Sequence, residues 1–206
     1  MKVSFVKIFC VFFITLAVLL LNNACQKNDD IILDKPLLDS IINTSRVLTD
    51  QKFGIDYEIK GCLEITGPNT TVTIEPNNII MCHPQACIKI TNGARLIILG
   101  EPQKETYIAG FDTLPGYWQG IWVEDNSTLE MQQVIISDAG KAGLDSNLQG
   151  SIFVDNTDTV IIKIKNSIIR NSAAHGIVLP GFAKAQLEAT NKYLDLGPGS
   201  EAIKYY

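Results

Sequence analysis

Short apolar triplets recur from Gly61 to Ile136, and residues typical of turns separate them. Gly and Asn in the gaps accept a positive φ angle, and Pro fixes φ, so each gap predicts a turn between two strands. Strands at a spacing of about eight residues fit a sandwich, a barrel or a solenoid. The triplets are Val72-Thr73-Ile74, Ile79-Ile80-Met81, Ile88-Lys89-Ile90, Leu96-Ile97-Ile98, Tyr107-Ile108-Ala109, Ile121-Trp122-Val123 and Val134-Ile135-Ile136.

Internal repeats favour the solenoid. Residues 128–139 match residues 161–172 when the two segments are superposed, and Val72-Thr73-Ile74 maps onto Leu96-Ile97-Ile98, 24 residues later. A period of this length is typical of coils that stack on one another. The apolar matches are Leu129 on Ile162, Met131 on Ile164, Ile135 on Ile168 and Ile136 on Ile169. A weaker third copy begins at Leu187, with Ala189, Asn191, Tyr193 and Leu194 in matching places.

The segment before the repeats is less regular. Ile55, Tyr57 and Ile59 alternate with polar residues, which is the period of a strand with one buried face. Residues 37–48 fit both helical and strand spacing. We therefore expect an N-terminal capping segment and a first strand in residues 37–60, followed by the repeat domain in residues 61–206.

Several segments resemble the coils of bacterial right-handed parallel β-helix surface proteins, which have a pectate-lyase-like solenoid. The resemblance covers about residues 45–203 and implies an all-β fold, a single-stranded right-handed parallel β-helix with three short strands per coil. It implies little about activity, because one fold carries many functions. The matching segments are Gly61-Cys62-Leu63-Glu64-Ile65, Val72-Thr73-Ile74-Glu75-Pro76, Gly93-Ala94-Arg95-Leu96-Ile97-Ile98-Leu99-Gly100, Tyr117-Trp118-Gln119-Gly120-Ile121-Trp122-Val123, Ser167-Ile168-Ile169-Arg170-Asn171-Ser172 and His175-Gly176-Ile177-Val178-Leu179.

The N-terminus has the pattern of an export signal. Lys2 and Lys7 precede the apolar run from Ile8 to Leu21, and small or polar residues follow it. The run is shorter than the roughly 20 residues that span a bilayer, so residues 1–24 predict a signal peptide instead of a membrane helix.

Cys25 follows Ala24 at the end of this segment and resembles the lipidated first residue of a bacterial lipoprotein, although Asn22 stands where that box usually has Leu. The alternative is ordinary cleavage of the signal peptide, without a lipid on Cys25. The acidic residues that follow resemble the tether of Bacteroidota surface lipoproteins, so we assign residues 25–36 as a tether. These features predict an exported protein at the outer membrane or cell surface, held to the membrane by a lipid on Cys25.

The charge of the chain is unfavourable for binding to nucleic acid. The net charge is −5, and removal of Lys2 and Lys7 makes it more negative. Nucleic-acid affinity comes largely from Lys and Arg, and the sequence has no basic patch, so we expect no nucleic-acid partner.

Three cysteines remain in the repeat region: Cys62, Cys82 and Cys87. We favour buried free thiols stacked in the core, because free Cys is among the most buried residue types. One disulfide is the first alternative, and Cys82 with Cys87 would close a short loop. A metal site with His83 is the second, weakened by the absence of a complete pair of Cys-x-x-Cys motifs.

Few residues suggest catalysis. Asp138 and Arg170 lie one repeat apart and are the candidate pair for a lyase groove, although solvated corner residues are the simpler interpretation. Asp145, Asp155 and Asp158 fall in loops where calcium could bind, but no calcium-loop motif is present, so we expect no cofactor and no metal. His83 and His175 are too far apart in the repeat to share a site.

Tyr117, Trp118 and Trp122 are the candidate binding residues, because aromatic faces stack on sugars. Packing at the edge of a coil is the alternative for all three. The leading hypothesis is a non-catalytic binding or adhesion module for polysaccharide. A polysaccharide lyase or glycoside hydrolase and a structural envelope protein are the alternatives. The exposed strand edges of the last coil require a cap, either a partner chain or the chain's own aromatic tail.

Overall fold

The computed structural model describes residues 36–38, 40–52, 54–155 and 160–206. These residues belong to one compact unit, Lys35–Tyr206. Every regular element in the described part is a strand. The signal peptide, Cys25 and all of the tether except Pro36 lie outside the described residues. No helix in the described part is long and apolar enough to cross a membrane.

In the described residues, nineteen strands form three parallel sheets. Sheet 1 has the order β1-β4-β7-β10-β13-β16-β19, sheet 2 the order β2-β5-β8-β11-β14-β17, and sheet 3 the order β3-β6-β9-β12-β15-β18. The strands are β1 (Ile41–Ile42), β2 (Arg46–Leu48), β3 (Tyr57–Ile59), β4 (Cys62–Thr66), β5 (Thr71–Ile74), β6 (Ile79–Cys82), β7 (Cys87–Thr91), β8 (Arg95–Leu99), β9 (Thr106–Gly110), β10 (Gly120–Val123), β11 (Thr128–Gln132), β12 (Val134–Ser137), β13 (Gly150–Val154), β14 (Ile161–Lys165), β15 (Ile168–Ser172), β16 (His175–Leu179), β17 (Lys184–Leu187), β18 (Lys192–Leu196) and β19 (Ile203–Tyr205).

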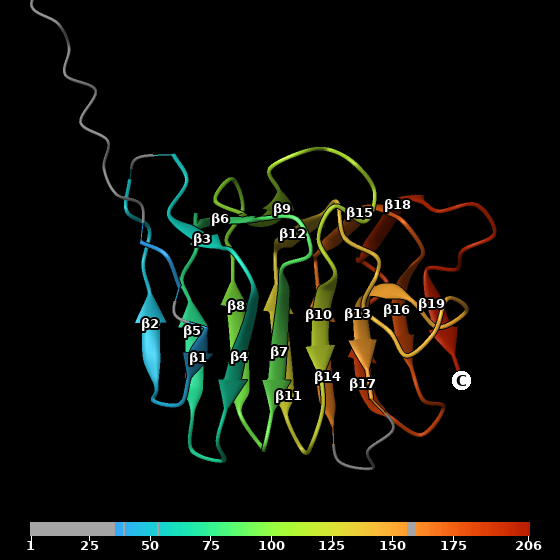
Figure 1. Cartoon of the computed structure of the whole chain (residues 1–206), viewed down its shortest axis with the longest axis horizontal. Coiled ribbons are helices and arrows are strands. Elements are labelled where there is room, and N and C mark those ends of the chain that lie inside the picture. Colours follow the sequence, from blue (N-terminus) through green and yellow to red (C-terminus); the bar gives the residue numbers. More distant parts are fainter. Residues whose placement is uncertain (1–35, 39, 53, 156–159) are drawn as a thin grey trace, which may run out of the picture. The chain divides into compact units, whose positions relative to one another are not determined.

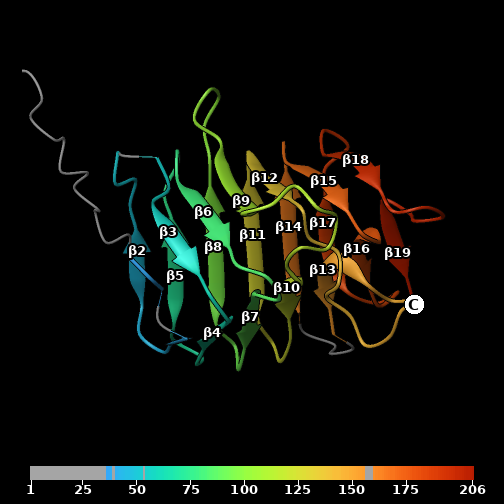
Figure 2. The same ribbon diagram turned by 45° about the horizontal axis from the view of Figure 1, so that its top comes forward.

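Each coil contributes one strand to each sheet in turn, so the described chain forms six coils and the first strand of a seventh. The colours of Figure 1 therefore run along the axis from one end to the other, and the tilted view of Figure 2 brings sheet 3 forward. The predicted fold, a right-handed parallel β-helix with three strands per coil, is confirmed.

Alternation along each strand creates the core. In β5 and β8 every second side chain is buried, as the period of a strand requires. Because the strands are paired in register, inward side chains stack on their equivalents in the next coil; Ile88, Ile121 and Ile152 form one such row. These rows form one continuous hydrophobic core along the axis.

Left-handed residues turn the chain at the corners. Gln133 and Asn166 each have a φ of 51° and follow the sheet 2 strand in successive coils. Gly100 lies beneath this corner, where an added Cβ would come 2.0 Å from the carbonyl oxygen of Gln133. A side chain at Gly100 would therefore displace the next coil.

Most of the predicted repeat register is correct. Leu129 pairs with Ile162, Ile135 with Ile168 and Val72 with Leu96. The third copy was placed wrongly, because Ile164 and not Ile162 pairs with Leu187, and Ile169 and not Ile168 pairs with Tyr193. The strands of this third copy carry many polar residues, so only a weak apolar pattern was available for the alignment.

The segment 37–60 also differs from its expected role as a cap. Strands β1, β2 and β3 pair with β4, β5 and β6, so this segment forms the first full coil.

At the C-terminal end of the solenoid each of the last three strands carries a lysine: Lys184 in β17, Lys192 in β18 and Lys204 in β19. Charged side chains, especially Lys, oppose edge-to-edge pairing of exposed strands. A partner chain over this end stays a prediction.

Candidate functional site

Trp118 belongs to the core, which corrects its assignment as a sugar-binding residue. It lies in the loop 111–119 between sheets 3 and 1, is fully buried, and donates its indole N–H to the carbonyl of Ser137 at 2.8 Å. It has no exposed ring face for a ligand. The spacing of aromatic residues in the sequence could not reveal this, because the loop folds back into the corner of the coil.

Tyr117 packs beside the backbone of the preceding strand. An added Cβ on Gly110 would come 2.7 Å from its ring, so a glycine is needed there. Tyr117 is partly exposed at this corner, and its carbonyl accepts the N–H of Gln85 at 3.2 Å. Tyr117 and Trp118 therefore do not form one aromatic surface.

Trp122 lies on the outer face of sheet 1, in register with Lys89 on one side and Phe153 on the other. Its ring meets that of Phe153 edge to face at 5.1 Å, and Phe153 stacks on Tyr206 at 6.0 Å. Ala142 and Val178 complete this small external cluster. The cluster covers much of Trp122, which is only partly exposed.

Tyr206 closes the cluster from the C-terminal side. Its hydroxyl donates to the carbonyl of Val154 at 3.0 Å, and burial raises the pKa of this phenol to about 12. The aromatic side chain thus packs on the outer face of sheet 1 and not over the end of the core.

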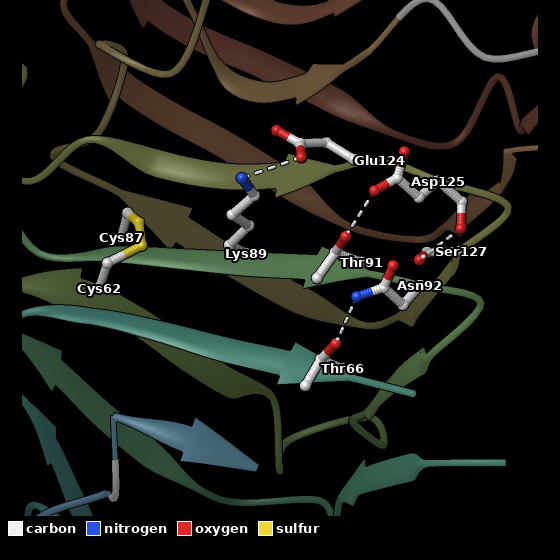
Figure 3. A network of polar contacts seen from close by, with 9 residues as sticks. All are labelled: Cys62, Thr66, Cys87, Lys89, Thr91, Asn92, Glu124, Asp125 and Ser127. Atoms are coloured by element: carbon white, nitrogen blue, oxygen red, sulfur yellow. Dashed lines mark hydrogen bonds and ion pairs between the residues drawn. A yellow bond between two sulfur atoms is a disulfide. The ribbon is translucent and has the colours of Figure 1, made fainter. Parts of the chain in front are cut away.

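A polar network lies on the same face, between β7 and the residues that directly follow β10 (Figure 3). The ammonium of Lys89 meets the carboxylate of Glu124 at 2.9 Å, and Thr91 donates to Asp125 at 2.8 Å. The hydrogen bond that Lys89 donates to Glu124 raises the pKa of Lys89, so this lysine is held in its charged form.

Asp138 and Arg170 do not form a pair. The Asp138 carboxylate is buried and accepts hydrogen bonds from Gly110 N, Ser137 Oγ and Asn171 Nδ2, at 3.2, 2.9 and 2.7 Å. Asn171 also donates to the carbonyl of Thr113, which fixes the loop 111–119. Arg170 is exposed, and no ion pair joins it to Asp138 among the described residues. Asp138 is therefore a structural anchor.

The remaining candidates for metal or catalysis are dispersed. Asp145 accepts two N–H groups of its own loop, and Asp158 lies outside the described residues. His83 contacts Glu58 at 3.0 Å, whereas His175 accepts the N–H of Glu201 at 2.9 Å near the other end of the solenoid. In the described ranges, no three His, Cys, Asp or Glu side chains gather as metal ligands would.

The cysteines adopt an arrangement that the sequence did not predict. Cys62 and Cys87 are register partners on the outer face of sheet 1 and form a disulfide (Figure 3). Cys82 is a free thiol in the core, stacked between Ile59 and Gly110. The expectation of buried free thiols is correct for Cys82 alone, and the Cys82–Cys87 alternative is wrong.

A groove on the outer face of sheet 2 was missed in the sequence. It has a volume of about 260 Å³ and crosses the four strands β8, β11, β14 and β17. The alignment of repeats contained the signal, since it superposed polar Glu130 on Lys163 and Gln132 on Lys165. The lining residues are Ile97, Leu99, Glu130, Met131, Gln132, Lys163, Ile164, Lys165, Gln186 and Glu188.

Register fixes the order of side chains along the groove. The row that runs parallel to the axis reads Ile97, Glu130, Lys163, Gln186, one residue from each coil. Glu130 accepts from Arg95 at 3.0 Å and meets Lys163 at 3.5 Å. A second hollow of about 390 Å³ adjoins it around Lys163 and Lys184. The surface combines an apolar end with amides and charges, spaced by roughly 4.8 Å per coil.

Comparison of the chain with protein-family models, with curated proteins and with solved structures gave no match. The functional assignment therefore depends on the residues and geometry described above.

The anchor role of Asp138 leads to a prediction with a matched control. Asp138→Asn preserves the left-handed backbone that Asn tolerates, but it replaces one acceptor oxygen by a donor. We expect a loss of about 1–3 kcal/mol in the free energy of unfolding, measured by urea denaturation. Asp195 occupies the equivalent corner two coils later with a φ of 51° and is exposed. Asp195→Asn should cost less than about 0.5 kcal/mol, and equal losses would contradict the anchor role.

The cysteine arrangement predicts a labelling pattern. Burial raises the pKa of the Cys82 thiol, so at pH 8 it stays protonated and inaccessible to iodoacetamide in the folded protein. After unfolding without reductant, peptide mapping should find label on Cys82 and none on Cys62 or Cys87. Labelling of either disulfide partner before reduction would contradict the assignment.

Proposed function

We propose that this protein is an exported, lipid-anchored surface module that binds polysaccharide without cleaving it, and that the ligand lies in the sheet 2 groove. The observation that carries the proposal is the groove itself, an open surface that crosses four coils in line with the axis. A linear polymer can contact one equivalent side chain per coil there. Amide and charged groups beside an apolar end suit the hydroxyls and ring faces of sugars.

The disulfide supports the export part of the proposal. Disulfides persist in oxidising compartments and are rare in the cytosol. Cys62 and Cys87 join adjacent coils on the outer face of sheet 1. This agrees with the signal-like residues 1–24 and with Cys25 as the lipidated residue of a Bacteroidota-type lipoprotein, which remain proposals from the sequence.

Polysaccharide cleavage is the first alternative, and the charges of the site do not favour it. A lyase needs a basic side chain that is free to take a proton from the sugar, whereas at the groove both Arg95 and Lys163 form ion pairs with Glu130, at 3.0 and 3.5 Å. A purely structural envelope role is the second alternative. It requires no groove, so the outcome of a binding experiment separates it from the proposal.

A binding experiment tests the proposal directly. The folded protein, residues 25–206, is titrated with a panel of neutral and acidic polysaccharides, and each mixture is examined for cleavage products. We expect binding without products. Substituting both groove amides in the variant Gln132→Ala/Gln186→Ala should weaken binding about tenfold, because each removes a hydrogen-bonding group worth about 1 kcal/mol.

The control variant for this experiment is Thr71→Ala/Thr73→Ala, which changes two outward polar residues of sheet 2 one coil before the groove. Its affinity should equal that of the unaltered protein. Binding that is lost equally in both variants would reject the groove as the site. Release of oligosaccharides would favour the lyase or hydrolase alternative, and no binding to any member of the panel would favour the structural role.

The lipid anchor has a separate test. The full chain is expressed in a bacterium that processes lipoproteins and is grown with a radiolabelled fatty acid. Label should appear on the protein and disappear in Cys25→Ser, with the protein moving from the membrane fraction to the soluble exported fraction. Cys10→Ser is the control and should retain the label, since Cys10 lies in the segment that is removed. Equal labelling of the Cys25 variant would contradict lipidation at this residue.

A further inference from the structure

The groove face of sheet 2 is cationic, although the chain as a whole has a net charge of −5. From β8 to the end of β17, its outward side chains include four cations and, with the adjoining Glu188, two carboxylates. The cations are Arg95, Lys163, Lys165 and Lys184, and the carboxylates are Glu130 and Glu188. Because the protein as a whole is negative, this local excess of positive charge needs an explanation in the role of this face.

Glu130 is already neutralised within this face. One of its oxygens faces both Arg95 and Lys163, at 3.0 and 3.5 Å. These three side chains form a ladder across three successive coils, because Arg95, Glu130 and Lys163 lie on neighbouring strands. The ladder holds Lys163 in the floor of the groove and neutralises Glu130, which leaves Glu188 at the end of the groove as its one carboxylate without an ion pair among the described residues.

Two further lysines lie on either side of this ladder. Lys165 lines the groove on β14, and Lys184 lines the adjoining hollow on β17. Both are exposed, and within the described residues neither has an ion pair. Their charges thus face solvent on the two sides of the row along which a bound polymer would run.

We infer that the ligand of the groove is an anionic polysaccharide, whose carboxylate or sulfate groups bind Lys165 and Lys184 while its sugar hydroxyls bind Gln132 and Gln186. The inference rests on the proposed function and specifies its ligand class. Charge complementarity selects an anionic over a neutral polymer. The amides and the apolar end at Ile97 and Leu99 select a sugar chain over a simple polyanion, which would need only positive charge.

The test compares alginate, in which every sugar carries a carboxylate, with carboxyl-reduced alginate of the same chain length. Isothermal titration with the protein, residues 25–206, should give at least tenfold tighter binding of alginate, and this preference should fall as salt rises from about 50 to 500 mM. In Lys165→Ala/Lys184→Ala the two polymers should bind with equal, weak affinity. Lys60→Ala/Lys192→Ala removes the same charge from exposed positions outside the groove and should keep the preference.

Each other outcome overturns the inference in a distinguishable way. Preferential binding of the reduced polymer, still sensitive to Gln132→Ala/Gln186→Ala, would reject the anionic ligand and leave the proposed function intact. Absence of binding to both polymers and to the wider polysaccharide panel would reject both. Equal affinity for a DNA duplex or for dextran sulfate, or an equal loss in the control variant, would mean non-specific attraction between charges. Circular dichroism spectra of both variants should match that of the unaltered protein.

Discussion

Parallel hydrogen bonding between successive coils is the constraint on which the rest of the structure depends. Every interior strand is bonded to the strand one coil before it and to the strand one coil after it, so each coil must return to the same three sheets in register. The chain length per coil can vary only at the corners: Ile41 and its partner Glu64 are 23 residues apart, whereas Leu129 and Ile162 are 33 apart. Long segments such as 138–149 are therefore carried as loops, which leaves the core undisturbed.

The same register decides where function can reside. Outward side chains form rows, and each sheet accumulates its own surface chemistry coil by coil. On sheet 1 the row changes from Lys89 through Trp122 to Phe153, and its apolar end is covered by Ala142 and Tyr206. The aromatic side chains there pack against the loop that contains Ala142 and against the C-terminal residue Tyr206, and they stabilise both. The groove on sheet 2 is not covered in this way, so its outward side chains remain accessible.

The fold could be predicted from the sequence because each coil of a solenoid repeats a similar local pattern of apolar and polar residues. Period-two alternation located the strands, and apolar matches located the coils, except near Leu187, where polar strands left the alignment ambiguous by one or two residues. Side-chain direction at the corners was not predictable. Trp118 lies in a loop whose path depends on the buried Asp138, and the disulfide between Cys62 and Cys87 follows from a register that had to be assigned for every coil first.

The engagement of the carboxylates gives the strongest argument for binding over hydrolysis. A glycosidase needs two carboxyl groups about 5–10 Å apart, one of them kept protonated by burial or by a neighbouring negative charge. Here Glu124 faces Lys89, Glu130 faces both Arg95 and Lys163, and Asp138 accepts three hydrogen bonds. Each is already engaged by cations or by hydrogen-bond donors of the protein. The ion pairs with Arg95 and Lys163 neutralise Glu130, so the groove presents Lys165 and Lys184 to an incoming chain. This arrangement of charges supports the proposal that the groove binds an anionic ligand without cleaving it.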